Sequence, residues 1–328
     1  VTDIATLDGV VFLVDEGDRV FKLARDLQSV EMSWSVDATF DLSSTLTASS
    51  GGLTAIATAQ GGAYVADNEA LYYVEPDGVT TAVSPLTDTL HGGAPLAAGP
   101  THLQVSAQGN VYALFGSTLA VVQMGAAESG PSVAHVSPRP PIESCGADAA
   151  ELCSADSPLS AQGIHLNDPD GLLVSWLPVD ASLSVGALQL FDVGTSGELT
   201  WLAQHDPFVG DLGQQPQVID VTSRPGWLFV LVNAVQVSQG SANGEPVSYV
   251  MAIDLSVKAL PARRSVISVD SIGRGLLAMD DLLFMATDSG IRIISMKNPT
   301  NLELLDVEGV FDQADTTSPE PTVRRLVV

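Results

Sequence analysis

Short runs of alternating apolar and polar residues recur along the chain. The segment GIRIISMKNPTNLELLDV, residues 290–307, alternates apolar and polar positions, turns at Asn298-Pro299 and then alternates again. A period of two residues is typical of a half-buried β-strand, and the turn residues between two such runs predict a hairpin. Five further copies of this pattern begin at Arg19, Ala70, Thr118, Ala187 and Tyr249.

Each copy follows another apolar run, such as WLFVLVN at 227–233 or LLFMATD at 282–288. Several of these runs follow one more short strand, as in THLQVSAQGN at 101–110. One unit is therefore predicted to contain four strands joined by turns, which is the antiparallel blade of a β-propeller. No segment keeps a 3.6-residue period over a dozen residues, so the sequence predicts an all-β fold.

The spacing of the copies predicts a ring of six four-stranded blades. The third strands are separated by 51, 48, 69, 62 and 41 residues, and the interval from the last one through both termini to the first is 57 residues. A closed ring requires such a wrap-around interval to resemble the others. Seven blades and a pair of β-sandwiches remain as alternatives. The intervals are counted between Val20, Leu71, Leu119, Leu188, Val250 and Ile291.

Residues 1–328 are predicted to form a single propeller domain with insertions. A proline-rich segment at 137–158 carries both cysteines, 207–217 is a second insertion, and 233–248 is predicted to form an extended hairpin. Inserted loops on a regular scaffold often form binding surfaces. The strand-like tail TVRRLVV at 322–328 is predicted to pair with the first blade, so that the N- and C-terminal strands close the ring.

The segment from 273 to 307 resembles the LVIVD-type repeat of bacterial and archaeal surface propellers. In it, LFMATDSGIRIISMKNP follows the order of that repeat, and AYVADNEALYYVEPDG at 63–78 resembles it as well. The segment GALQLFDVGTSGELTWL at 186–202 matches its second half. The resemblance implies an exported or surface-exposed propeller. It implies no catalytic residue, because the repeat's Asp and Gly residues serve turns and its apolar residues serve packing.

Acidic residues outnumber basic ones three to one, with 39 Asp and Glu, 13 Lys and Arg, and a net charge of −26. Nucleic acids and anionic lipids bind through clustered Lys and Arg, so neither is predicted as a partner. The charge suits an extracellular or salty medium, divalent cations, a basic partner or simply a solvated surface. No apolar run approaches the roughly 18 residues of a membrane span, so no transmembrane segment is predicted.

The two cysteines, Cys145 and Cys153, lie close together in the sequence. They enclose a short loop that a disulfide can close, and the alternative is two unrelated surface thiols. A disulfide would indicate an oxidising compartment. Together with the resemblance, this predicts an extracellular, periplasmic or cell-surface location.

The segment NDPDG at 167–171 places several oxygen ligands together, so Asp168 and Asp170 are candidate calcium ligands. Calcium requires six to eight oxygens, and the position where an EF-hand has its glutamate is Pro178. Tight turns use the same residues, which is the alternative interpretation. No cofactor is therefore predicted beyond this calcium candidate.

Other chemistry-bearing residues form no recognisable catalytic motif. The five histidines lack metal-binding spacing, although His165 and His205 lie near acidic residues. No GxSxG, GxxxxGK[ST] or strand-linked GxGxxG motif is present, so no catalytic or nucleotide-binding residue is predicted. The tryptophans are predicted to pack between blades, with sugar stacking as the alternative: Trp34, Trp176, Trp201 and Trp227.

These observations predict a non-catalytic propeller that serves as a platform for a protein partner, or as a subunit of an extracellular assembly. One alternative is a propeller that binds a glycan or a small ligand. Another is a calcium-dependent hydrolase or lactonase with its site at the centre of the ring. The last rests on fold analogy alone.

Overall fold

The structure is a computed structural model, and strands dominate the part of the chain that it describes. The described part contains no helix long and apolar enough to cross a membrane. The chain divides into two compact units: Val1–Pro138 with Val193–Thr200 form most of the first, and Arg139–Asp192 with Trp201–Leu326 form most of the second. The described residues are 3–7, 10–14, 19–26, 33–42, 53–59, 62–67, 70–75, 80–82, 87–88, 94–95, 100–115, 118–124, 131–136, 162–167, 170–176, 188–205, 214–236 and 245–305.

Three four-stranded sheets belong to the first unit, and their strands follow the order of the chain. All strand pairs for which a register is defined are antiparallel. The first sheet contains β1 (Asp3–Leu7), β2 (Val10–Val14), β3 (Arg19–Asp26) and β4 (Ser33–Asp41). The second contains β5 (Leu53–Ala59), β6 (Gly62–Asp67), β7 (Leu71–Val74) and β8 (Thr80–Ala82). The third contains β11 (His102–Val105), β12 (Val111–Phe115), β13 (Thr118–Met124) and β14 (Pro131–Val136).

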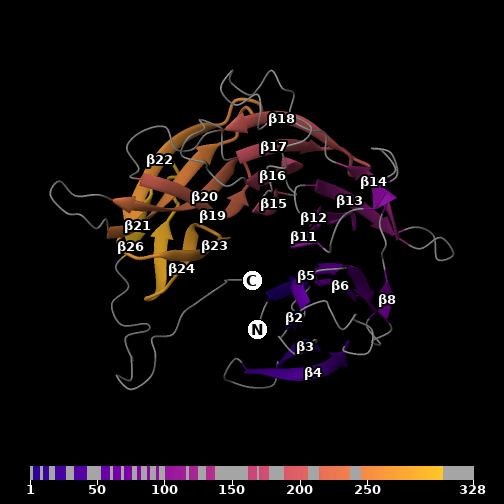
Figure 1. The fold of residues 1–328 in the computed structure, drawn as a ribbon. Helices are drawn as coiled ribbons and strands as arrows, with labels where there is room; N and C mark the ends of the chain where they lie inside the picture. Colours follow the sequence, from indigo (N-terminus) through magenta and orange to yellow (C-terminus); the bar gives the residue numbers. More distant parts are fainter. Residues whose placement is uncertain are drawn as a thin grey trace. The chain divides into compact units, whose positions relative to one another are not determined.

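Three more four-stranded sheets follow in the same consecutive manner (Figure 1). The fourth contains β15 (Gly163–Asn167), β16 (Leu172–Trp176), β17 (Leu188–Val193) and β18 (Leu199–His205). The fifth contains β19 (Gln214–Arg224), β20 (Trp227–Gln236), β21 (Glu245–Asp254) and β22 (Ala262–Val269). The sixth contains β23 (Gly273–Met279), β24 (Leu282–Thr287), β25 (Gly290–Ser295) and β26 (Glu303–Leu305).

The predicted repeat is confirmed at the level of single strands. Each of the six residues that open the predicted third strands lies in the third strand of a four-stranded sheet, namely in β3, β7, β13, β17, β21 and β25. The extended hairpin at 233–248 is confirmed as well, because Gln236 in β20 pairs with Glu245 in β21. Alternation of apolar and polar residues was therefore sufficient to find these strands.

Two details differ from the sequence prediction. Residues Gln214–Gln217, which were predicted to belong to an insertion, form the start of β19 instead. A small pair of strands, β9 (Thr87–Asp88) and β10 (Ala94–Pro95), was not predicted, since two-residue strands carry no alternation. The tail at 322–328 lies outside the described residues, so its pairing stays a prediction, as does the single domain.

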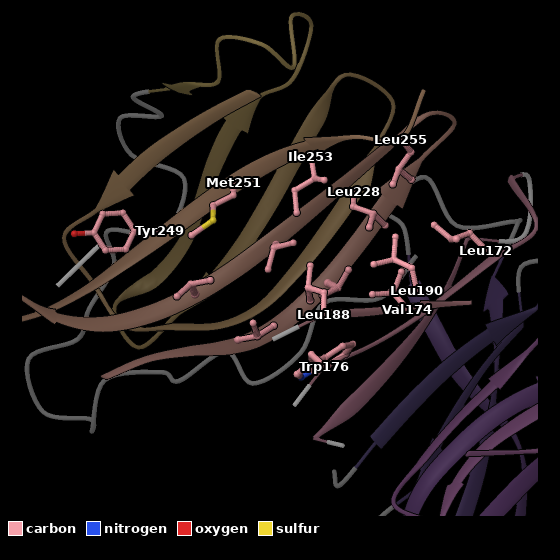
Figure 2. Close-up of a cluster of buried hydrophobic side chains, with 14 of the residues drawn as sticks. Leu172, Val174, Trp176, Leu188, Leu190, Leu228, Tyr249, Met251, Ile253 and Leu255 are labelled. Carbon is pink, nitrogen blue, oxygen red and sulfur yellow. The ribbon is translucent and has the colours of Figure 1, made fainter. Parts of the chain in front are cut away.

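Neighbouring sheets within each unit share an apolar core. In the first unit, β5 contacts both β1 and β11, so the first strands of neighbouring sheets are adjacent. In the second unit, β19 likewise contacts both β15 and β23. Figure 2 shows the core between the fourth and fifth sheets, where Trp176 and Leu188 meet residues of β20 and β21 such as Leu228 and Met251. Face-to-face packing of consecutive four-stranded sheets is the arrangement of propeller blades.

Candidate functional site

Strand β19 places polar side chains on both of its faces, and each face meets a different neighbouring sheet. Asp220, Thr222 and Arg224 contact β23 or the turn that follows it, whereas Ser223 contacts His165 on β15. Successive side chains of a strand point to opposite faces, which explains this division. We call His165, Asp220, Thr222, Ser223 and Arg224, together with the start of β23, the inner-strand cluster.

One face of β19 binds the free edge of β23. The amide of Leu276 donates to Asp220 Oδ2 over 2.8 Å, and the amide of Ala278 donates to Thr222 Oγ1 over 3.3 Å. Arg224, the last residue of β19, places Nη1 3.3 Å from Oδ1 of Asp281, which lies in the turn after β23. Since β23 is the first strand of its sheet, its outward N–H groups have no partner strand within that sheet. Asp220 and Thr222 therefore satisfy donors that would otherwise be unpaired.

The start of β23 is fixed by a second set of polar contacts. Gly273 N donates to Ser248 Oγ over 2.8 Å, and Asn233 Nδ2 donates to Gly273 O over 3.0 Å. Ser248 Oγ also lies 2.6 Å from both Asn233 Oδ1 and Ser271 O. A Cβ atom on Gly273 would lie 2.7 Å from Leu231 Cδ1, so any larger residue at this point requires the Leu231 side chain to move.

The opposite face of β19 carries a contact between a histidine and a serine, two residue types that can exchange a proton. His165 Nε2 lies 2.8 Å from Ser223 Oγ, and both side chains keep partial contact with solvent. A serine hydroxyl bonded to a neutral imidazole can pass its proton to the ring nitrogen. Among the described residues, this is the histidine that faces a serine hydroxyl from another sheet.

The turns beside this pair are joined by Asp170. Asn167 Nδ2 donates to Asp170 Oδ2 over 2.8 Å, and the amide of Gly226 donates to the same oxygen over 2.7 Å. Gly226 has a positive φ of 77°, a conformation that glycine adopts readily. The carboxylate thereby ties the β15–β16 turn to the β19–β20 turn, close to Ser223.

Burial shifts two groups of the cluster in ways that both favour the neutral form. Burial raises the pKa of Asp220 to about 6, although hydrogen bonds from the amides of Leu276 and Val221 oppose the shift. Burial lowers the pKa of His165 to about 4. Desolvation disfavours any charge, so an acid and a base shift in opposite directions. At neutral pH His165 is uncharged and Asp220 carries a negative charge.

The predicted calcium ligands fall only partly within the described residues. Asp170 acts as the link between two turns, as just described, and Asp168 lies outside the described residues. Over the described ranges, no group of three or more His, Cys, Asp or Glu side chains is placed to hold a metal ion. The calcium prediction stays untested.

The other residues singled out in the sequence are the two cysteines, the tryptophans and His205. Cys145 and Cys153 lie outside the described residues, so their disulfide stays a prediction. Trp176 is buried in the core between two sheets, as predicted for packing, and Trp201 packs edge-on against Phe191. His205 lies on β18 and is not part of the inner-strand cluster.

The exposed apolar side chains of the described residues are unevenly distributed. Six of the seven large ones lie between 257 and 305, and the seventh is Val36 on β4. Leu260 is 75% exposed and Val257 is 53% exposed, both in the turn after β21. The others are Val266, Met279, Leu304 and Leu305.

No protein-family model and no curated protein matches this chain. A crystal structure of a candidate 6-phosphogluconolactonase from Bacteroides uniformis matches it with a TM-score of 0.59 and 12% sequence identity, over 93% of this chain and 84% of that chain. The chain has an all-β, propeller-like fold. At this identity the likeness concerns the fold alone. A chain from an S. cerevisiae assembly of dbp5, nup159 and gle1 matches with a TM-score of 0.49 and 10% identity, over 90% of this chain and 72% of that chain.

Sequence reasoning singled out His165 but not the residues around it. Ser223 lies 58 residues further along the chain, and Asp220 and Thr222 sit in a stretch with no catalytic motif. Only the adjacency of the first strands of neighbouring sheets brings these groups together. The nearest signal in the sequence is the repeat of four-stranded units, because the first strands of neighbouring units are adjacent.

Proposed function

We propose that this chain is a six-bladed β-propeller, closed by its terminal strands, that serves as a platform for a protein partner or as a subunit of an extracellular assembly. Six four-stranded sheets built from consecutive strands support six blades. The resemblance of residues 273–307 to the LVIVD-type repeat, the acidic composition and the Cys145–Cys153 pair support an exported or cell-surface location.

The observation that carries the platform function is the exposed apolar set in the fifth and sixth sheets. Six of the seven large apolar side chains that are exposed among the described residues belong to these two sheets and their turns, with Leu260 and Val257 the most exposed of the six. Exposed apolar groups that lie together are typical of interaction sites. Charge supports the same region. Residues 224–328 contain nine basic and 12 acidic residues, whereas residues 1–223 contain four basic and 27 acidic residues. A partner with an acidic surface is therefore repelled less by this part of the chain than by residues 1–223.

The test compares two exposed apolar positions in different units. The chain is purified from its own source as wild type, as Leu260→Asp and as Val36→Asp, and each sample is weighed by native mass spectrometry. We expect a stoichiometric partner chain with wild type and Val36→Asp, and its loss with Leu260→Asp while the circular dichroism spectrum is unchanged. A partner retained by Leu260→Asp, or the absence of any partner from wild type, would contradict the proposal.

The same measurement addresses the alternatives. A divalent ion that adds mass and leaves with a chelator, in a sample without a partner chain, would favour the calcium-dependent hydrolase with Asp168 and Asp170 as candidates. A glycan or small molecule retained in the native mass would favour the ligand-binding propeller.

A further inference from the structure

We propose that Ser223 is a nucleophile activated by His165 and that this pair cleaves small, uncharged carboxylic esters, including lactones. The contact that carries the proposal is the 2.8 Å approach of His165 Nε2 to Ser223 Oγ across two neighbouring sheets. A nucleophile and a base within hydrogen-bonding distance form the minimal unit of acyl transfer. The inference adds an activity to the chain and does not rest on the platform function.

The pair is held by the framework on both sides. His165 sits in the middle of β15, between the buried residues Ile164 and Leu166. Ser223 is the second last residue of β19, and three residues later Gly226 donates to Asp170 in the turn after β15. Asp170 thus links the turn that follows β15 to the turn that follows β19.

The state of the imidazole suits a proton acceptor. Because burial lowers its pKa to about 4, the ring is neutral at neutral pH and offers one lone pair. The tautomer with hydrogen on Nδ1 directs that lone pair from Nε2 to Ser223. Two other serines with assigned contacts bind backbone groups instead: Ser265 Oγ donates to Pro299 O over 2.8 Å, and Ser248 accepts from Gly273 N.

The proposed reaction balances with water as the only co-reactant. The Ser223 hydroxyl passes its proton to His165 Nε2 while Oγ forms a bond to the carbonyl carbon of the ester. The bond from that carbon to the alcohol oxygen breaks, and His165 returns the proton to the departing alcohol. Water then attacks the acyl-serine and gives a proton through His165 to Ser223 Oγ, so that a carboxylic acid leaves and the serine is restored.

The charge of the chain limits the class of ester. With a net charge of −26, the protein repels anionic molecules as they approach. Both members of the pair lie on strands and are only partly exposed, so a small acyl group fits the contact better than a long one. We therefore expect neutral short-chain esters to react in preference to phosphorylated or carboxylated ones.

A fluorophosphonate probe tests the nucleophile directly. The full chain is treated with the probe, digested and mapped by mass spectrometry, and the same is done with p-nitrophenyl acetate to trap one acetyl group. We expect both labels on Ser223 in the wild-type chain. Labelling is expected to disappear in Ser223→Ala, to fall at least tenfold in His165→Gln and to be unchanged in the control Ser265→Ala.

Several outcomes would overturn the proposal. A wild-type chain that takes no label at Ser223 refutes it without need of any variant. Labelling at Ser223 that persists in a folded His165→Gln chain, as judged by circular dichroism, reduces the contact to a structural hydrogen bond. Failure of this test leaves the platform function intact, because the partner measurement uses Leu260 and Val36 instead.

Discussion

Neighbouring sheets pack through apolar side chains in both units, and in the second unit side-chain hydrogen bonds to a main chain are added. In the first unit, β5 meets β11 through small and apolar side chains, with Ala55, Ala57 and Leu103 in one buried cluster. In the second, an apolar cluster also lies between β19 and β23, but Asp220 and Thr222 add hydrogen bonds to the main chain of β23. Apolar contact attracts without direction, whereas a hydrogen bond fixes one atom opposite another. The same strand pattern thus supports apolar packing at both junctions, and at the junction of β19 with β23 it also supports hydrogen bonds that fix the register.

The apolar junction of the first unit is expected to be the more costly one to break. Leu103→Ala removes a 5%-exposed side chain from the cluster that joins β5 and β11. The lost burial and the cavity left behind predict a loss of about 2 to 5 kcal/mol of unfolding free energy. Urea unfolding followed by circular dichroism measures this loss. A loss below about 1 kcal/mol would show that apolar packing at this junction contributes little to stability.

The polar contacts on both faces of β19 are expected to respond to pH. The folded pKa of Asp220, about 6, is above the unfolded value of roughly 3.9, so its stabilising contribution is lost as pH rises from about 4 to 6. The folded pKa of His165, about 4, is below the unfolded value of roughly 6.5, so its contribution is lost as pH falls across the same window. The contribution of each group to the unfolding free energy is at most about 3 kcal/mol, and partial solvent contact reduces it. The two contributions change in opposite directions with pH.

Variants separate these opposing effects. From pH 4.5 to 6.5, Asp220→Asn is expected to gain unfolding free energy relative to wild type, and His165→Asn is expected to lose it. Urea unfolding at the two pH values gives both differences. Variants that track wild type at both values would show that burial does not perturb these groups.

A smaller effect is expected at the start of β23. Ser248→Ala removes the hydroxyl that accepts from Gly273 N and contacts Asn233, and Ser248 is fully buried. Leaving buried polar groups without partners predicts a loss of about 2 kcal/mol. The control Ser265→Ala, whose half-buried hydroxyl donates to Pro299 O, is expected to lose less in the same thermal or urea unfolding experiment. Equal losses would contradict a special role for the Ser248 network.

The smallest effect is expected for an ion pair on the outer strands. Arg264 Nη2 lies 2.8 Å from Asp254 Oδ2, and the arginine side chain is 48% exposed. Exposed pairs contribute at most about 1 kcal/mol, and salt screens them. Arg264→Ala is therefore expected to unfold nearly as wild type in high salt, and a larger loss there would indicate packing by the arginine stem.

Particular residues show why the sequence predicted the strands better than the cluster. Runs such as LFVLV at 228–232 reveal strands locally, because apolar residues there must face the neighbouring sheets. Strand β19 reads QQPQVIDVTSR, and its polar residues and proline hide the strand. Two of its polar residues, Asp220 and Thr222, bind the main chain of the next sheet, so part of what obscures the strand pattern also makes the contacts of β19. A contact such as His165 with Ser223 depends on sheet adjacency, which spacing does not encode.

The consecutive order of strands within each sheet has a consequence for how the chain is made. In every described four-stranded sheet the four strands are consecutive in the chain, so these four can pair with one another as soon as the fourth has been synthesised (Figure 1). Mostly local pairing favours rapid formation of each hairpin, and domains begin to fold while synthesis continues. Each sheet can then pack against the next one as that sheet is synthesised. In the second unit β19 precedes β23 in the chain, so Asp220 and Thr222 are synthesised before the strand whose amides they bind.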